Sequence, residues 1–312
     1  MNVDTIDWVI FHIVIAVMVI VDLKVLEHDD RDPTLKEVLT WTILWILVGV
    51  GYGFLILWHY GEEPALLYFT AFLVEKSLSL DNMFVFFAIF TYFGVRYRFQ
   101  HKVLIVGILS AVIMRAFFIY GGIILLQAFH WMVYIFGAVL VISGVKLAAG
   151  VEEEVEPEKN PMVKFAKKVL PISDKYDGSK FFIRENGFKF TPMILVLLAI
   201  ETTDIIFAVD SVPAVLAITT DFFIAYTSNI MAILGLRALY MLVAQIIYRL
   251  EHLNKGLGAL LVYLGVKMVL SGFHTKIPII LSVLVIIVIL TLSIAVSLLL
   301  TKKKQEIKKK KN

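Results

Sequence analysis

The sequence predicts an all-α polytopic membrane protein of about nine transmembrane helices that contains an inverted repeat of three helices. The first observation is composition, because 60% of the 312 residues are hydrophobic and the mean hydropathy is +0.86. Soluble proteins are about 45–50% apolar, so this excess indicates surface that lipid covers. The second observation is an uneven distribution of Lys and Arg, and the third is an internal repeat. The absence of Cys excludes disulfides, thiolate metal sites and cysteine catalysis.

Apolar runs give the expected spans, since a transmembrane helix takes roughly 20 residues. The runs fall at about 8–27, 38–60, 64–94, 102–127, 131–150, 191–220, 222–248, 256–273 and 277–300. The third and sixth are the longest, and both have charged residues at their centres. Because this pattern is typical of discontinuous transmembrane helices, we expect both to be broken or unwound. The first run has no basic residues before it and is expected to be a mature span rather than a signal peptide.

Basic residues predict the orientation of the chain. Of the 29 Lys and Arg residues, 23 lie in segments that the nine runs place on one side, and Lys276 alone lies on the other. Loops rich in Lys and Arg stay in the cytoplasm. We therefore expect an outside N-terminus and a cytoplasmic C-terminus.

The predicted cytoplasmic side includes one long loop, 151–190, and a basic tail, 301–312. Within the loop, 161–172 has apolar and Lys residues at helical spacing, which fits either an interfacial helix or a solvated loop helix. The dipeptide Asn186-Gly187 between apolar runs predicts a hairpin. The tail is either drawn to anionic lipid or a plain stop-transfer flank.

Two stretches of sequence repeat each other. GAVLVISGVK (137–146) and GALLVYLGVK (258–267) are identical at seven of ten positions, including the final Lys. Upstream, ILSAVIMRA (108–116) aligns with IMAILGLRA (230–238). Spans three to five and six to eight are thus predicted to be two copies of one unit.

The repeat defines the expected organisation within a single transmembrane domain, 1–312. The first copy covers 64–150 and the second 191–273. Because each copy has an odd number of spans, the second must enter the membrane from the opposite side. Inverted repeats of this kind are common in secondary transporters, which bind substrate at the repeat interface. The alternative is a gene duplication without transport.

Acidic residues lie at bilayer depth in the third and sixth runs. The stretches VEKSLSLDNMFVF (74–86) and IETTDIIFAVDSVPAV (200–215) contain Glu75, Asp81, Glu201, Asp204 and Asp210. An ionisable residue at that depth is costly unless paired or hydrated, so it marks a candidate functional site. Each six-residue pair, Glu75 with Asp81 and Asp204 with Asp210, precedes a small polar residue.

These side chains form an all-oxygen set of possible ligands. The carboxylates are joined by the amide of Asn82, the hydroxyl of Ser211 and carbonyls that Pro213 exposes by removing a helix bond. Such donors suit hard divalent cations, namely Mg²⁺, Ca²⁺ and Mn²⁺. We predict that Asp81 and Asp210, as equivalent positions of the two copies, jointly bind the cation.

A purely structural charge network is the competing interpretation. The same spans contain five basic residues, Lys76, Arg115, Lys146, Arg237 and Lys267. Intramembrane charges usually pair, so these residues are possible partners of the acids. Lys146 and Lys267 lie near span ends and can extend to the interface. Arg115 and Arg237 lie mid-span and are the expected partners.

The acidic motifs resemble those of the TerC family of bacterial membrane proteins. The resemblance lies in Glu75 with Asp81-Asn82, in 201–204 and 210–213, and in the run FFIRENG…TP. It covers roughly 1–273. It implies a helical plan like that of lysine exporters, a place in the bacterial cytoplasmic (inner) membrane, and an association with manganese efflux and tellurite resistance. The implied site residues are Glu75, Asp81, Glu201, Asp204 and Asp210.

Three hypotheses about function follow. The first is a secondary exporter of Mn²⁺ that works by alternating access and is coupled to protons. The second is a scaffold or metal-delivery partner for other membrane or secreted proteins, and the third is an intramembrane hydrolase. The sequence has no P-loop, nucleotide fingerprint or Ser-His-Asp set. We therefore expect no enzyme activity, organic cofactor or nucleic-acid partner, only the lipid bilayer, the metal, protons and other membrane proteins.

Overall fold

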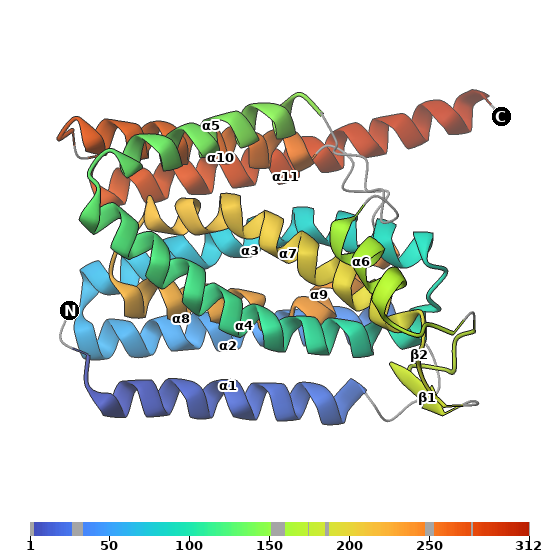
Figure 1. The fold of residues 1–312 in the computed structure, drawn as a ribbon. Coiled ribbons are helices and arrows are strands. Elements are labelled where there is room, and N and C mark those ends of the chain that lie inside the picture. Colours follow the sequence, from blue (N-terminus) through green and yellow to red (C-terminus); the bar gives the residue numbers. More distant parts are fainter. Residues whose placement is uncertain are drawn as a thin grey trace.

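The computed structural model describes residues 3–26, 34–150, 160–173, 175–184, 187–246, 253–275 and 277–311. For Asp81 it describes the backbone alone. Nearly all of this chain is helical, and the remainder includes one two-stranded hairpin (Figure 1). The all-α prediction is therefore confirmed.

The helices and strands follow the predicted order. The elements are α1 (Thr5–Leu26), α2 (Leu35–Tyr60), α3 (Glu62–Tyr92), α4 (Tyr97–Ala128), α5 (Met132–Ala148), α6 (Pro161–Val169), β1 (Phe182–Arg184), β2 (Phe188–Phe190), α7 (Met193–Leu216), α8 (Phe222–Ile233), α9 (Leu236–Ile246), α10 (Leu253–Gly272) and α11 (Ile279–Lys311). Each predicted run contains one of these helices, except that the seventh contains both α8 and α9.

Within the described residues, five helices are long and apolar enough to cross a membrane by themselves: α1, α2, α4, α10 and α11. The pair α8 and α9 passes the same test when taken as one bent segment. Three helices of the predicted spans are not among those that pass the test. Helix α5 is apolar but has only 17 residues, and α3 and α7 contain the acidic residues of the candidate site. The chain is thus a polytopic membrane protein, and the count of nine spans stays a prediction.

The prediction that the third and sixth runs are broken is wrong. Helices α3 and α7 are continuous, and α7 accommodates Pro213. Three of their hydroxyl groups do not require unwinding, because Ser77, Thr202 and Thr203 each donate to the carbonyl four residues earlier in the same helix. These bonds satisfy the hydroxyls within a regular helix.

The break lies instead in the seventh run, where α8 and α9 meet at an angle of 44°. Gly235 has a φ of +82°, in the left-handed region that ends helices and favours glycine. A Cβ at this position would lie 2.6 Å from the Cβ of Trp45 in α2. Backbone conformation and close packing therefore both require glycine at the break.

The helices form layers (Figure 1). Helices α5, α10 and α11 make one layer, α1 lies at the opposite side, and α3 and α7 lie between them and run in opposite directions. Helix α3 packs against α8, and α4 packs against α7. Helix α6 and the hairpin lie at the end of the molecule opposite the N-terminus.

The loop contains the two elements that the sequence suggests. Helix α6 begins after Asn160, whose side chain accepts hydrogen bonds from the amides of Met162 and Val163. Strands β1 and β2 pair antiparallel, with Arg184 opposite Phe188. Gly187 of the predicted turn has a φ of +121°, whereas Asn186 lies outside the described residues.

Helices α5 and α10 pack along a seam of four glycines. A Cβ at Gly144 would lie 2.6 Å from the carbonyl oxygen of Gly258, and a Cβ at Gly265 would lie 2.6 Å from that of Gly137. The two repeated stretches therefore touch backbone to backbone. Small residues allow this approach between membrane helices, where packing rather than water exclusion drives association.

Replacing Gly258 by Ala is expected to destabilise the α5–α10 contact. The new Cβ would lie 2.5 Å from the Gly144 carbonyl oxygen, so the backbone would have to move. Overpacking of this kind costs about 1–3 kcal/mol. Thermal unfolding in detergent measures the effect. Gly121→Ala is the matched control, because its Cβ meets nothing within 4 Å, and an equal loss in both variants would contradict the seam.

Candidate functional site

A buried ion pair joins α3 to α4 near the centre of the molecule. Arg115 Nη1 lies 2.9 Å from Glu75 Oε1, and both side chains are almost fully excluded from solvent. Arg115 also donates to the hydroxyl of Ser211 in α7 over 2.7 Å, and Asn229 of α8 donates to Glu75 Oε2 over 3.0 Å. Four helices thus meet around one guanidinium, and Arg115 has the kind of acidic partner that the sequence predicts.

Lys76 connects α3 to the last turn of α8. Its ammonium donates to the carbonyl of Ala232 over 2.9 Å. Carbonyls at a helix C-terminus lack partners within the helix and carry partial negative charge, which a cation stabilises. Glu75 and Lys76 therefore both hold α8 just before its break.

Two acids of α7 lie near this pair. The hydroxyl of Ser110 in α4 donates to Glu201 Oε2 over 2.5 Å. Gly107, one turn earlier, lies beside the same carboxylate, since a Cβ there would be in ordinary contact with Glu201 Oε1 at 3.6 Å. Asp204 is within electrostatic range of Arg115, Glu201 and Glu75. Asp204 is thus within electrostatic range of both the ion pair and Glu201, and the three acids form one cluster.

Asp210 lies further along α7 and contacts a different helix. Its Oδ1 accepts a hydrogen bond of 2.6 Å from Ser143 of α5. The next residue, Ser211, is buried and contacts Arg115. Adjacent predicted ligands thus contact different helices, α5 and α4, because successive residues of a helix are about 100° apart.

The structure describes only some of the side chains of the predicted metal site. Asn82 is buried in α3, but the side chain of Asp81 lies outside the described residues. Among the described side chains, no three His, Asp or Glu residues gather closely enough to hold a metal ion. Joint binding of a cation by Asp81 and Asp210 stays a prediction.

The remaining bases have other surroundings. Arg237 is fully buried, and its Nε lies 3.0 Å from Asp22 Oδ2 of α1. The sequence analysis missed Asp22, although its signal was present as an acid in the last turns of an apolar run. Lys146 is exposed, Lys267 is partly buried, and neither forms an ion pair with an acid whose side chain is described.

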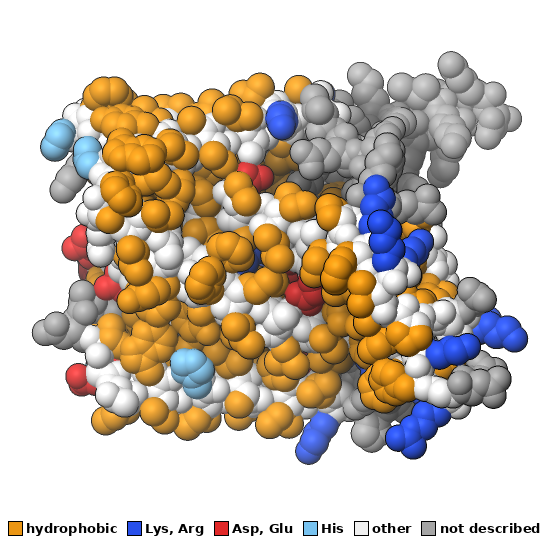
Figure 2. All heavy atoms as spheres, in the orientation of Figure 1, with side chains coloured by type: hydrophobic (Ala, Val, Ile, Leu, Met, Phe, Trp, Pro, Cys, Tyr) orange, Lys and Arg blue, Asp and Glu red, His pale blue; other side chains and the backbone are white. Residues whose placement is uncertain are grey.

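Charge is also unevenly distributed over the surface. Figure 2 shows Lys and Arg gathered at the end that carries α6 and the hairpin, and acidic and His side chains at the other end. Between the two ends is a broad hydrophobic band in which a few acidic side chains are visible. This pattern fits a bilayer around the middle of the molecule, with the basic end beyond one of its faces.

Known proteins with similar sequences are membrane proteins. The model of the family described as integral membrane protein TerC matches residues 60–305. An uncharacterized membrane protein of Myxococcus xanthus is 42% identical over 87% of this chain and 85% of its own. The Escherichia coli (strain K12) protein Alx, provisionally described as a membrane-bound redox modulator, is 38% identical over 88% and 89%.

A third relative, an uncharacterized membrane protein of Rickettsia conorii, is 37% identical over 84% of this chain and 87% of its own. No solved structure matches the chain. The family match covers more than half of the sequence, and these three relatives align along most of their length. The chain therefore belongs to the TerC family of integral membrane proteins.

Proposed function

We propose that this protein is a secondary transporter that exports a divalent cation, with Mn²⁺ as the cargo, by alternating access coupled to protons. The observation that carries the proposal is the excess of acid in the cluster around Arg115. Glu75 pairs with this guanidinium, and Asp204 is within electrostatic range of the guanidinium and of both glutamates. Even with Lys76 counted, three carboxylates meet two bases, so the cluster keeps a net negative charge that attracts a cation.

The contacts between α5 and α10 support an inverted repeat. The alignment makes Gly137 equivalent to Gly258, and Gly144 equivalent to Gly265. The close contacts join Gly137 to Gly265 and Gly144 to Gly258. Exchanging the two copies converts each contact into the other, as a two-fold axis through an antiparallel seam requires. Inverted repeats provide two related conformations that open to opposite sides.

The acids of α3 and α7 have matching surroundings as well. Glu75 contacts Asn229, and Glu201 lies beside Gly107, which the repeat aligns with Asn229. The two glutamates thus occupy related positions on helices that run in opposite directions (Figure 1). This match supports a site at the interface of the two copies, where transporters of this architecture bind substrate.

The geometry suggests how the site would exchange cargo for protons. Hydroxyls of Ser110 and Ser143 orient Glu201 and Asp210 while leaving their negative charge in place. A divalent cation that enters from the cytoplasm would bind carboxylate oxygens, which are suited to Mn²⁺. Protons that arrive from outside would neutralise the carboxylates and release the ion.

Transport by the purified full-length chain in liposomes tests the proposal. Uptake of ⁵⁴Mn should exceed that of protein-free liposomes and rise when a pH gradient drives protons in the opposite direction. Competition by Mg²⁺ and Ca²⁺ then measures selectivity. If Mn²⁺ does not move in a protein-dependent way, with or without the gradient, the proposal is overturned.

A scaffold or metal-delivery role is the second candidate, and the hairpin favours it. Phe182 and Phe188 are exposed and stack with ring centroids 5.8 Å apart, which presents an aromatic surface at the basic end. Aromatic side chains are enriched at protein interfaces. The redox role in the description of Alx would not use a thiol here, because the chain contains no Cys. A protein with only a scaffold role would not transport Mn²⁺ across the membrane in the liposome assay.

Cysteine labelling tests the proposed orientation, and the wild type provides a Cys-free background. Single cysteines at Lys175 and Glu62, both exposed, lie in the basic loop and at the start of α3. With the N-terminus outside, an impermeant maleimide added to intact cells should label the Glu62 variant and spare the Lys175 variant. Permeabilised cells serve as the control, and equal labelling of both sites in intact cells would reject the orientation.

A further inference from the structure

Asp22 and Arg237 form a second buried ion pair, away from the acids of α3 and α7. Arg237 lies in the first turn of α9, two residues after Gly235 at the break. It is fully excluded from solvent and bonds both the carboxylate and the backbone carbonyl of Asp22. Helix α1 precedes both copies of the repeat. The pair therefore links the start of α9, just after the break, to α1, a helix that lies outside the repeat.

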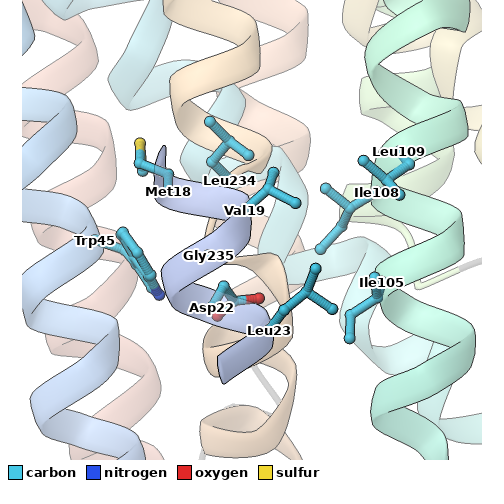
Figure 3. Close-up of a pocket in the computed structure, with 10 residues that line it drawn as sticks. All are labelled: Met18, Val19, Asp22, Leu23, Trp45, Ile105, Ile108, Leu109, Leu234 and Gly235. Carbon is cyan, nitrogen blue, oxygen red and sulfur yellow. The ribbon is translucent and has the colours of Figure 1, made fainter. Parts of the chain in front are cut away.

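A pocket lies beside this pair (Figure 3). It is partly open, has room for about one water molecule, and is lined by Asp22, Trp45, Gly235 and apolar side chains of α1, α4 and the segment between α8 and α9. Asp22 Oδ1 and Trp45 Nε1 are both buried, and the indole N–H of Trp45 is a hydrogen-bond donor beside the Asp22 carboxylate. The acceptor and the donor thus face the same pocket, where a water molecule would bond to both.

The groups that face Asp22 are few. Besides Arg237 of α9 and the indole of Trp45 in α2, His101 in the first turn of α4 is within electrostatic range. Arg237 stays charged at all accessible pH values. Asp22 is thus an ionisable group that lines the pocket, and its protonation would remove the negative charge that faces the fixed charge of Arg237.

Contacts on the other side of the break lead to the proposed cargo site. Helix α8, which ends just before Gly235, contributes Asn229 to Glu75 and the Ala232 carbonyl to Lys76. A change in the angle between α8 and α9 would therefore act directly on the residues that hold Glu75. These contacts form a continuous route from Asp22 through Arg237 and the break to the acids.

We infer that Asp22 binds a further proton, besides those that neutralise the cargo carboxylates, and that this proton couples the pH gradient to cation movement; this inference rests on the proposed function. Protonation of Asp22 removes the charge that holds Arg237, because an arginine in a buried pair depends on its partner's negative charge. Helix α9 is then released from α1 and turns at Gly235. Loss of the proton restores the pair and the original angle.

The test separates coupling from cation binding in liposomes. Wild-type protein should exchange ⁵⁴Mn without a gradient and accumulate it when a pH gradient is imposed. Asp22→Asn should lose the pH-driven accumulation while the exchange continues, and Asp22→Glu should keep both. Asp7→Asn is the matched control, because Asp7 lies on the same helix and bonds Tyr60 rather than an arginine. It should behave as the wild type.

A double variant covers the case in which Asp22→Asn does not fold. Asp22→Asn with Arg237→Gln removes both charges, so no buried charge is left alone. If the pair is only structural, the double variant should recover pH-driven accumulation, and the inference is overturned. If Asp22 carries the proton, the double variant should recover exchange alone. A wild type that neither exchanges nor accumulates Mn²⁺ would overturn the proposed function and the inference with it.

Fluorescence gives a readout that does not depend on transport. Trp45 is the tryptophan beside Asp22, and the other four, Trp8, Trp41, Trp58 and Trp131, can be replaced by Phe. The emission of Trp45 should show one titration step as the pH is lowered, because protonation of Asp22 changes the charge beside the indole. The step should vanish in Asp22→Asn and persist in Asp7→Asn. A step that survives in Asp22→Asn would overturn the assignment.

Discussion

Replacing Arg115 by Gln is expected to destabilise the folded protein by about 3–5 kcal/mol, the usual cost of removing one partner of a buried ion pair. The guanidinium lies 2.9 Å from Glu75, whose side chain is almost completely buried. Without it, the carboxylate would keep the amide of Asn229 but lose its neighbouring counter-charge. The hydroxyl of Ser211 would lose its donor as well. Thermal unfolding in detergent should show a markedly lower melting temperature.

The double variant Glu75→Gln with Arg115→Gln distinguishes a charge effect from a packing effect. Two neutral amides of similar volume leave no buried charge, so most of the lost stability should return. Arg98→Gln is the control on the same helix, because Arg98 is exposed and should change stability by no more than about 0.5 kcal/mol. A melting temperature of Arg115→Gln equal to that of Arg98→Gln would show that the ion pair does not stabilise the fold.

Hydropathy predicts the helices of this protein well because a bilayer requires long apolar segments with internally bonded backbones. It does not predict their breaks. The repeat aligns Gly235, at the break, with Ile113 in the unbroken helix α4. The sequence signal for the break was therefore a glycine at a position where the other copy has a β-branched residue. Charged residues at the centre of a run did not indicate a break.

Ion-pair partners are less predictable, because they depend on which helices pack together. Arg115 and Arg237 are equivalent in the repeat, yet Arg115 pairs with Glu75 inside the first copy and Arg237 pairs with Asp22 outside both. The six-residue spacing suggested that Asp81 and Asp210 are equivalent. Under the inverted repeat that we propose, the contacts of Glu75 and Glu201 favour a match between these two glutamates, which would shift the alignment of α3 and α7 by three residues. Sequence spacing identified the acids but did not establish which of them correspond.

Replacing Asp210 by Asn is expected to reduce Mn²⁺ transport by more than about tenfold, which corresponds to at least ~1.4 kcal/mol. The amide nearly preserves the shape of the side chain and removes one negative charge. A divalent cation in a water-poor site loses more from this change than a surface ion pair would, because the effective dielectric constant is lower. The same loss is expected for Asp81→Asn. Efflux of Mn²⁺ from cells that contain matched amounts of each variant in the membrane measures the effect.

Ser143→Ala separates the charge of Asp210 from its hydrogen bond. This change removes the hydroxyl that lies 2.6 Å from Asp210 Oδ1 and leaves the carboxylate in place. If negative charge binds the cargo, Ser143→Ala should transport far better than Asp210→Asn. Glu201→Gln should have a smaller effect than Asp210→Asn, because Asp204 lies within electrostatic range of Glu201 and keeps a negative charge beside it. Wild-type efflux by both Asp81→Asn and Asp210→Asn would remove these residues from the site and favour a structural charge network in its place.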